Sequence, residues 1–115
     1  MSEFLITVLR DLTSRNPHPS QEELKDAFKP YQDWIAGIAA ENRLVAPPKR
    51  WDLDGRVVSR AEIVQQGPYA VNNMSMGGLF LIRANDYDEA VEFAKKCPII
   101  KYGAVVEVRM AIPAA

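Results

Sequence analysis

The sequence predicts an α+β fold of the ferredoxin-like kind, a split β-α-β sandwich with an inserted hairpin that pairs into a dimer. Strand and helix signals follow one another in the order strand, long helix, hairpin, strand, helix, strand. With only two helices, both are expected on one face of the sheet, yet two of the strands are apolar on both faces. Leaving the second face in water would expose a larger apolar patch than monomers usually tolerate. We therefore expect a homodimer that buries this sheet face.

Composition and charge fit a single domain over residues 1–115. The chain is 48% hydrophobic and 25% charged, as is ordinary for a soluble globular protein. Its 14 basic and 15 acidic residues nearly cancel, which argues against nucleic acid or an acidic membrane as a partner. No apolar run reaches the ~20 residues of a membrane helix, and the N-terminus lacks the features of a signal peptide. A cytoplasmic location is expected.

The first strand is predicted over Glu3–Arg10, where β-branched residues are frequent and apolar residues fall on both faces. The polar stretch Asp11–Pro19, which contains two prolines, predicts a loop. Ser20 and Glu23 form a capping-box signature, in which each side chain accepts a hydrogen bond from the other residue's backbone amide. The long helix is therefore expected to begin at Ser20.

The long helix is predicted to extend to Asn42, with Pro30 on its exposed side. Because proline removes one hydrogen bond of a helix, we expect a kink there or a split into Ser20–Lys29 and Pro30–Asn42. Apolar residues at helical spacing predict the stripe that faces the core. This stripe consists of Leu24, Ala27, Phe28, Tyr31, Ile35, Ile38 and Ala39.

The middle of the chain predicts short extended pieces separated by turns. Leu44–Ala46 is short and apolar, and two prolines follow it. Trp51–Val58 predicts a hairpin whose tight turn is Asp54–Gly55. Ala61–Gln65 is expected to be a further short extended piece.

The stretch Gln66–Gly78 predicts a loop that lines a pocket and then enters a central strand. A Gly-Pro pair opens this loop and a Gly-Gly pair closes it, with aromatic and amide side chains between them. The apolar run Leu79–Ala84 predicts the strand itself, again covered on both faces.

The C-terminal part predicts one helix and one strand. Asp86 lies three residues before Glu89, which is a second capping signal, and apolar residues at helical spacing follow as far as Lys96. Ala104–Ile112 alternates in polarity and predicts the last strand.

Several motifs give the chain a resemblance to the YCII-related (DGPF-domain) family, whose signature is a D-G-P-F loop. They are, in order, Y-Q-D-W-I at Tyr31–Ile35, R-L-V at Arg43–Val45, D-G-R-V-V at Asp54–Val58, G-P-Y-A, G-G-L-F-L-I, D-Y-D-E-A-V-E-F-A-K-K-C-P-I-I-K-Y-G, and V-E-V-R-M at Val106–Met110. Their spacing and order cover the chain from about Phe4 to Pro113. The resemblance implies a dimeric α+β barrel, in agreement with the dimer expected from the strands.

The resemblance also implies a pocket between the long helix and the sheet, and members with a proposed chemistry are small-molecule lyases or isomerases. Tyr31 occupies the place of a histidine found in a subset of the family. In the signature loop, Gln66 replaces the usual aspartate and Tyr69 the phenylalanine. Downstream, neutral residues stand where the family favours charged ones: Val71, Asn73 and Met74. Because a general acid or base at this loop would need carboxylates, we expect weakened acid–base chemistry.

The candidate ligand-binding residues are Tyr31, Arg50, Gln66, Tyr69 and Asn73. Tyr31 either packs in the core with its hydroxyl bonded or offers that hydroxyl to the pocket, where it is the one candidate proton donor. Arg50, beside Trp51, either forms a stacked surface pair or clamps an anionic ligand.

The other reactive side chains are interpreted as structural. His18, the only histidine, lies between two prolines and is interpreted as a solvated loop residue rather than a catalytic one. Cys97, the only cysteine, is interpreted as a buried thiol, because no second cysteine or nearby histidine would activate it. Nucleotide, zinc and serine-hydrolase motifs are absent from the sequence, and neither a metal nor another cofactor is expected.

Two functions stay open. The first is a dimeric binding or regulatory protein that keeps the family's pocket but not its ionisable residues. The alternative is a lyase or isomerase acting on a small organic molecule, with Tyr31 as the proton donor.

Overall fold

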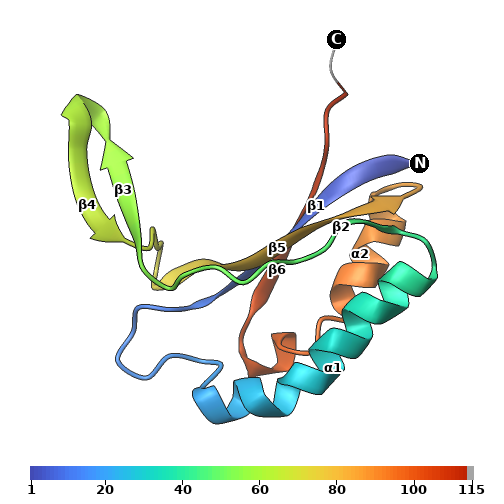
Figure 1. Cartoon of the computed structure of the whole chain (residues 1–115), viewed down its shortest axis with the longest axis horizontal. Coiled ribbons are helices and arrows are strands. Elements are labelled where there is room, and N and C mark those ends of the chain that lie inside the picture. The colour runs from blue at the N-terminus through green and yellow to red at the C-terminus, as the bar shows by residue number, and fades with distance from the viewer. Residues whose placement is uncertain (114–115) are drawn as a thin grey trace.

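A four-stranded antiparallel sheet with two helices on one face forms the body of the protein (Figure 1). The computed structural model describes residues 1–113. The elements of this body, in sheet order and then by helix, are β2 (Leu44–Ala46), β5 (Met74–Ala84), β1 (Ser2–Asp11), β6 (Val105–Met110), α1 (Gln21–Ala40) and α2 (Tyr87–Lys95). A separate hairpin, made of β3 (Gly55–Ser59) and β4 (Ile63–Gly67), stands away from the sheet. The predicted α+β fold of the ferredoxin-like kind is confirmed.

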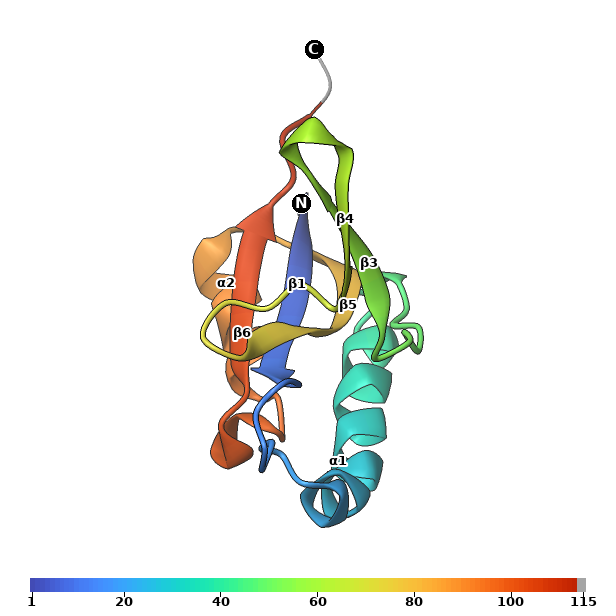
Figure 2. The same cartoon turned by 90° about the vertical axis from the view of Figure 1, so that its left-hand side faces the viewer.

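The core lies between the sheet and the two helices, which lie on the same face of it (Figures 1 and 2). Side chains alternate along β1, so that Phe4, Ile6 and Val8 face this core and are at most 2% exposed. Phe80 of β5 packs edge-on against Trp34 of α1, with ring centroids 5.3 Å apart. The expectation that both helices cover one face of the sheet is confirmed.

Helix α1 begins as its sequence predicts and runs without a break. Ser20 Oγ accepts a hydrogen bond from the Glu23 amide at 3.2 Å, and Glu23 Oε1 accepts one from the Ser20 amide at 2.8 Å. The alternative in which Pro30 splits the helix is wrong, because residues 21–40 form one helix. Tertiary packing of its apolar face compensates for the missing hydrogen bond. Neither α1 nor any other helix within residues 1–113 has the length and apolar character needed to cross a membrane.

The buried stripe of α1 differs from the predicted one. Phe28 is 63% exposed and Ala39 is also exposed, so their assignment to the core is wrong. Trp34, which the predicted stripe lacks, is buried, and its Nε1 donates a hydrogen bond to the Phe93 carbonyl at 2.9 Å. This hydrogen bond allows the indole to be buried, because its one polar group is satisfied.

The prediction of a hairpin turn at Asp54–Gly55 is wrong. The strands of the hairpin are β3 and β4, and the turn between them is the 3₁₀ segment Arg60–Glu62. Apolar β-branched residues in both strands favour this pairing over the Asp-Gly turn signal. The turn requires positive φ at Ala61 and Glu62, a conformation that is uncommon for either residue type, so the sequence does not announce it.

Strand β5 begins at Met74, before the predicted start at Leu79. The pair Gly77–Gly78 therefore lies within the sheet and does not close a loop. The turn that precedes the strand is formed by Asn72–Asn73, both of which have positive φ. Asparagine tolerates this conformation better than most residues, and this signal outweighs the Gly-Gly pair.

A β-bulge interrupts the pairing of β5 with β1. Val8 pairs with Gly78 and Leu9 pairs with Met76, so Gly77 is the extra residue on β5. The bulge lies where the sheet leaves the core and borders a cavity under α1.

The C-terminal elements agree with their predicted positions. At the start of α2, Asp86 Oδ1 accepts a hydrogen bond from the Glu89 amide at 2.9 Å. Strand β6 lies within the predicted range Ala104–Ile112. Arg43, which directly precedes β2, forms an ion pair with Glu89 and so connects the chain after α1 to α2.

Candidate functional site

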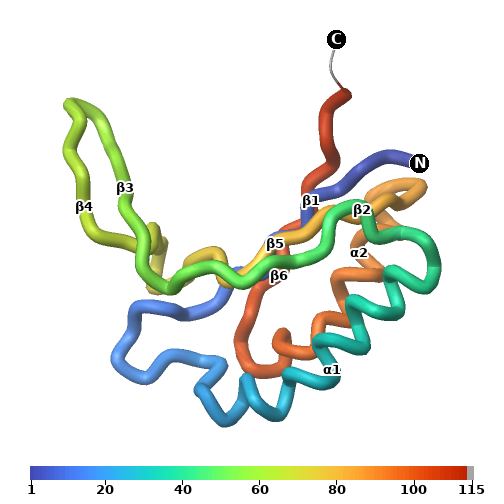
Figure 3. Tube along the Cα trace, viewed as in Figure 1, coloured from blue at the N-terminus to red at the C-terminus, as the bar shows by residue number. Residues whose placement is uncertain are grey.

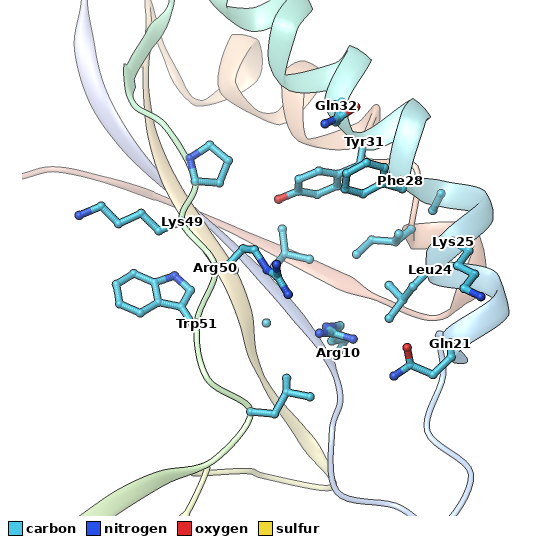
Figure 4. Close-up of a pocket in the computed structure, with 17 residues that line it drawn as sticks. Arg10, Gln21, Leu24, Lys25, Phe28, Tyr31, Gln32, Lys49, Arg50 and Trp51 are labelled. Atoms are coloured by element: carbon cyan, nitrogen blue, oxygen red, sulfur yellow. The ribbon is translucent and has the colours of Figure 1, made fainter.

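A cavity of about 810 Å³ lies between the first half of α1, strands β1 and β5, and the extended segment 47–53 (Figure 4). Figure 3 shows the chain running from β2 along the sheet to the hairpin, so this segment forms the wall opposite α1. The lining residues from α1 are Gln21, Leu24, Lys25, Ala27, Phe28, Tyr31 and Gln32. The opposite wall contributes Pro48, Lys49, Arg50, Trp51 and Leu53, and the remainder is Val8, Arg10, Gly77, Gly78 and Ile99.

Tyr31 points its hydroxyl into this cavity (Figure 4). Its ring packs edge-on against Trp34, with centroids 5.5 Å apart, and a methyl group at Gly78 would lie 3.7 Å from the hydroxyl oxygen. Burial, followed by the nearby Cys97, raises the pKa of Tyr31 to about 12, against a smaller opposing effect of Arg10. The hydroxyl is therefore protonated at neutral pH, where it acts as a hydrogen-bond donor and not as a base.

Arg10 is the one cationic side chain of the cavity that is partly buried. It continues the row of β1 side chains that face the helices, and its side chain lies over the bulge residue Gly77. Burial lowers the pKa of the Arg10 guanidinium, which nevertheless stays charged at neutral pH. Within residues 1–113, no carboxylate forms a salt bridge with it. Sequence reasoning missed this residue, although the alternation of Phe4, Ile6 and Val8 places Arg10 on the covered face.

Arg50 reaches the cavity from the opposite wall. It points into the space between the segment 47–53 and α1, whereas Lys49 and Trp51 extend to the other side of that segment (Figure 4). Arg50 is exposed and, like Arg10, has no salt bridge within residues 1–113. Two guanidinium groups and one hydroxyl therefore meet around the same space.

Two predicted ligand-binding residues of the signature loop do not line the cavity. Gln66 lies on the exposed strand β4, where its side-chain nitrogen is 3.4 Å from Asp54 Oδ2. Tyr69 is 70% exposed. Its backbone carbonyl, and not its ring, is held by the sheet, through a hydrogen bond donated by the Ser75 hydroxyl.

Asn73 also lies outside the cavity lining. It forms a turn with Asn72, and its side-chain oxygen accepts a hydrogen bond from Thr13 Oγ1 at 3.0 Å. Of the five predicted ligand-binding residues, the structure brings together Tyr31 and Arg50 around the cavity. The other three lie outside the cavity lining, on β4 and in the segment between β4 and β5. Ligand binding by these three residues stays a prediction.

His18 and Cys97 do not line the cavity either. His18 is exposed, and its Nδ1 lies 3.1 Å from Glu23 Oε1. Cys97 is 4% exposed, and burial raises the pKa of its thiol, so little reactive thiolate is present at neutral pH. In the part of the chain that the structure describes, no group of three or more His, Cys, Asp or Glu side chains is placed to hold a metal ion.

Comparison with known protein families gives one finding. A family model of the YCII-related domain matches residues 12–111 of this chain. The matched range contains every strand and helix after β1, and therefore both walls of the cavity. No curated protein matches the chain.

The raised pKa of Tyr31 predicts a defined dependence of stability on pH. Because the pKa in the folded state, about 12, lies above the ~10 of an unfolded tyrosine, folding favours the protonated form. The contribution of Tyr31 to stability is present below pH ~10 and is lost as the pH rises toward 12. We expect the wild type to lose stability relative to Tyr31→Phe over this range in urea unfolding. A difference spectrum in which the Tyr31 hydroxyl ionises below pH ~9 would contradict this assignment.

Proposed function

The chain belongs to the YCII-related family, and from this premise we propose that it is a cytoplasmic homodimer that binds a small organic molecule in the cavity between α1 and the sheet. Its role is binding or regulation, and the family's acid–base chemistry is weakened or lost.

The composition of the cavity is the observation that carries this proposal. Within residues 1–113, the lining contains neither a carboxylate nor an imidazole, and these groups are the most frequent general acids and bases in proteins. Tyr31, the one hydroxyl of the lining, has a raised pKa and holds its proton at neutral pH. The cavity has the volume and the mixed apolar and polar lining typical of a small-molecule site.

The alternative function is a lyase or isomerase in which Tyr31 donates a proton. The observation in its favour is the presence of Arg10 and Arg50, because fixed cations stabilise negative charge that develops in a transition state. Such a reaction would also need a base to accept a proton from the substrate. The described lining supplies no group suited to that task at neutral pH, so we favour binding.

The second face of the sheet supports the homodimer, because no helix of residues 1–113 covers it (Figure 1). On this face, Leu5 and Leu9 of β1 stand opposite Leu81 and Met76 of β5. Val105 of β6, opposite Leu9, is 53% exposed. A symmetric pairing of two copies would bury this row in each, at about 25 cal/mol per Å² of apolar surface.

The hairpin β3–β4 supports the same association. It projects from the sheet on the side opposite the helices (Figure 1). Val58, Ile63 and Val64 on this hairpin are between 53% and 67% exposed. Because an isolated two-stranded ribbon is marginally stable in water, we expect the hairpin to pack against the second copy.

A cavity-filling substitution tests the binding site. We expect ligand-observed NMR with a library of small organic molecules to find binders of the wild type. Leu24→Trp should abolish their binding by filling the cavity, whereas Ala36→Trp, on an exposed position of the same helix outside the lining, should not. Binders that are unaffected by Leu24→Trp would place the site elsewhere, and a library without binders would contradict the proposed function.

A charge placed on the uncovered sheet face tests the dimer. We expect the wild type to sediment as a dimer at micromolar concentration and Leu81→Lys to sediment as a folded monomer, because the lysine charge would have to be desolvated in the interface. Ala36→Lys, which adds the same charge on the outer side of α1, is the control and should stay dimeric. A wild type that sediments as a monomer would contradict the dimer.

A further inference from the structure

Positive charge is concentrated around the cavity beyond what the composition of the chain explains. Four cationic residues border the cavity, although the Lys49 side chain extends away from it (Figure 4), and within residues 1–113 no acidic residue borders it. In the whole chain, however, acidic residues slightly outnumber basic ones, 15 to 14. The four are Arg10, Lys25, Lys49 and Arg50. A concave site that gathers one sign of charge attracts ligands of the opposite sign.

Of these four residues, Arg10 has the least access to water. Lys25, Lys49 and Arg50 are exposed and can be hydrated, but Arg10 is partly buried and burial lowers its pKa. A charged group that loses water needs a counter-charge or hydrogen-bond acceptors in exchange. The described residues supply no salt bridge to it, so the free protein holds a partly desolvated cation without a counter-charge.

The bulge in β5 leaves the space that the Arg10 side chain occupies. The Arg10 side chain passes directly over Gly77, where a methyl group would lie 2.6 Å from Nε and 3.0 Å from Cδ. Such a contact is too close for any non-glycine residue unless the arginine moves. The neighbouring Gly78 has a different environment, since a methyl group there would meet the Tyr31 hydroxyl at an ordinary 3.7 Å. The position of the Arg10 guanidinium therefore depends on one of the two glycines.

The other lining residues indicate which chemical groups the ligand should carry. Arg50 and the Tyr31 hydroxyl point into the same space as Arg10 (Figure 4). Leu24, Phe28 and Ile99 border the space as well and offer apolar surface beside the charged groups. A guanidinium group presents two parallel N–H donors, which match the two oxygens of a carboxylate.

We propose that the cavity binds a small organic carboxylate with an apolar or aromatic body, and that Arg10, held over Gly77, binds the carboxylate. This inference rests on the proposed function, because it names the ligand class of the same cavity. Arg50 and the Tyr31 hydroxyl complete the polar side of the site, and the α1 side chains cover the body of the ligand.

Matched acids and amides separate charge recognition from binding in general. The probes are naphthylacetate, benzoate and octanoate, each with its uncharged amide, and titration calorimetry measures their affinities. We expect the acids to bind at least about tenfold more tightly than their amides. Amides that bind as well as the acids would overturn the carboxylate proposal and leave the proposed function intact. If neither class binds, both fail. Phenyl phosphate is the remaining probe, and tighter binding of it than of benzoate would also overturn the proposal.

Substitutions at three positions then test the role of Arg10. Arg10→Met keeps the length and apolar stem of the side chain, and it should remove the preference for acids while raising the melting temperature of the free protein. Gly77→Ala should weaken acid binding about tenfold by displacing the guanidinium. The control is Gly37→Ala, at an exposed glycine of α1 outside the lining where a methyl group meets nothing within 4 Å, and it should change acid binding less than about twofold. Equal effects of the two glycine substitutions, or a lower melting temperature for Arg10→Met, would overturn the assignment.

Discussion

The alternation of side chains along β1 is the constraint on which the rest of the structure depends. This strand lies between β5 and β6, and its side chains on the helix face form one row. Phe4, Ile6 and Val8 in that row are buried against the helices and hold the layers together. The next position is Arg10, which cannot be buried in an apolar core without a partner. Where the row changes from apolar to charged, the core ends and the cavity begins.

The bulge at Gly77 and the burial of Trp34 follow from the same constraint. Trp34 fills the space over the middle of the sheet, with its indole nitrogen bonded to the Phe93 carbonyl. One helical turn closer to the start of α1, Tyr31 reaches the rim of the core and turns its hydroxyl to the cavity. Beyond it the bulge leaves room for the Arg10 side chain. Core packing and the chemistry of the cavity are thus set by neighbouring positions on the same two elements.

The sequence predicts the helices and strands whose signals lie within a few neighbouring residues. It does not predict features that depend on pairing between segments distant in the chain. The capping box at Ser20, the cap at Asp86 and the alternation of the last strand predict their elements correctly. The hairpin turn is missed because strand pairing outweighs the Asp-Gly signal, and the true turn uses residues that rarely adopt positive φ.

The residues of the candidate site, too, are predicted from the sequence only in part. Tyr31 and Arg50 are identified from the sequence, but Arg10 is overlooked because a charged residue at the end of an apolar strand reads as its boundary. The alternation along β1 puts Arg10 on the covered face, but no local pattern predicts the bulge in β5 that leaves space there for its side chain.

The most direct test of carboxylate binding by Arg10 is the NMR signal of its Nε–H group, assigned by its loss in Arg10→Met. In the free protein, we expect this proton to exchange with water more slowly than that of the exposed Arg60. On addition of naphthylacetate the signal should move downfield, as expected for a hydrogen bond to a carboxylate, and naphthylacetamide should leave it in place. Saturation of the protein by the acid without any change in the Arg10 signal would contradict carboxylate binding by Arg10.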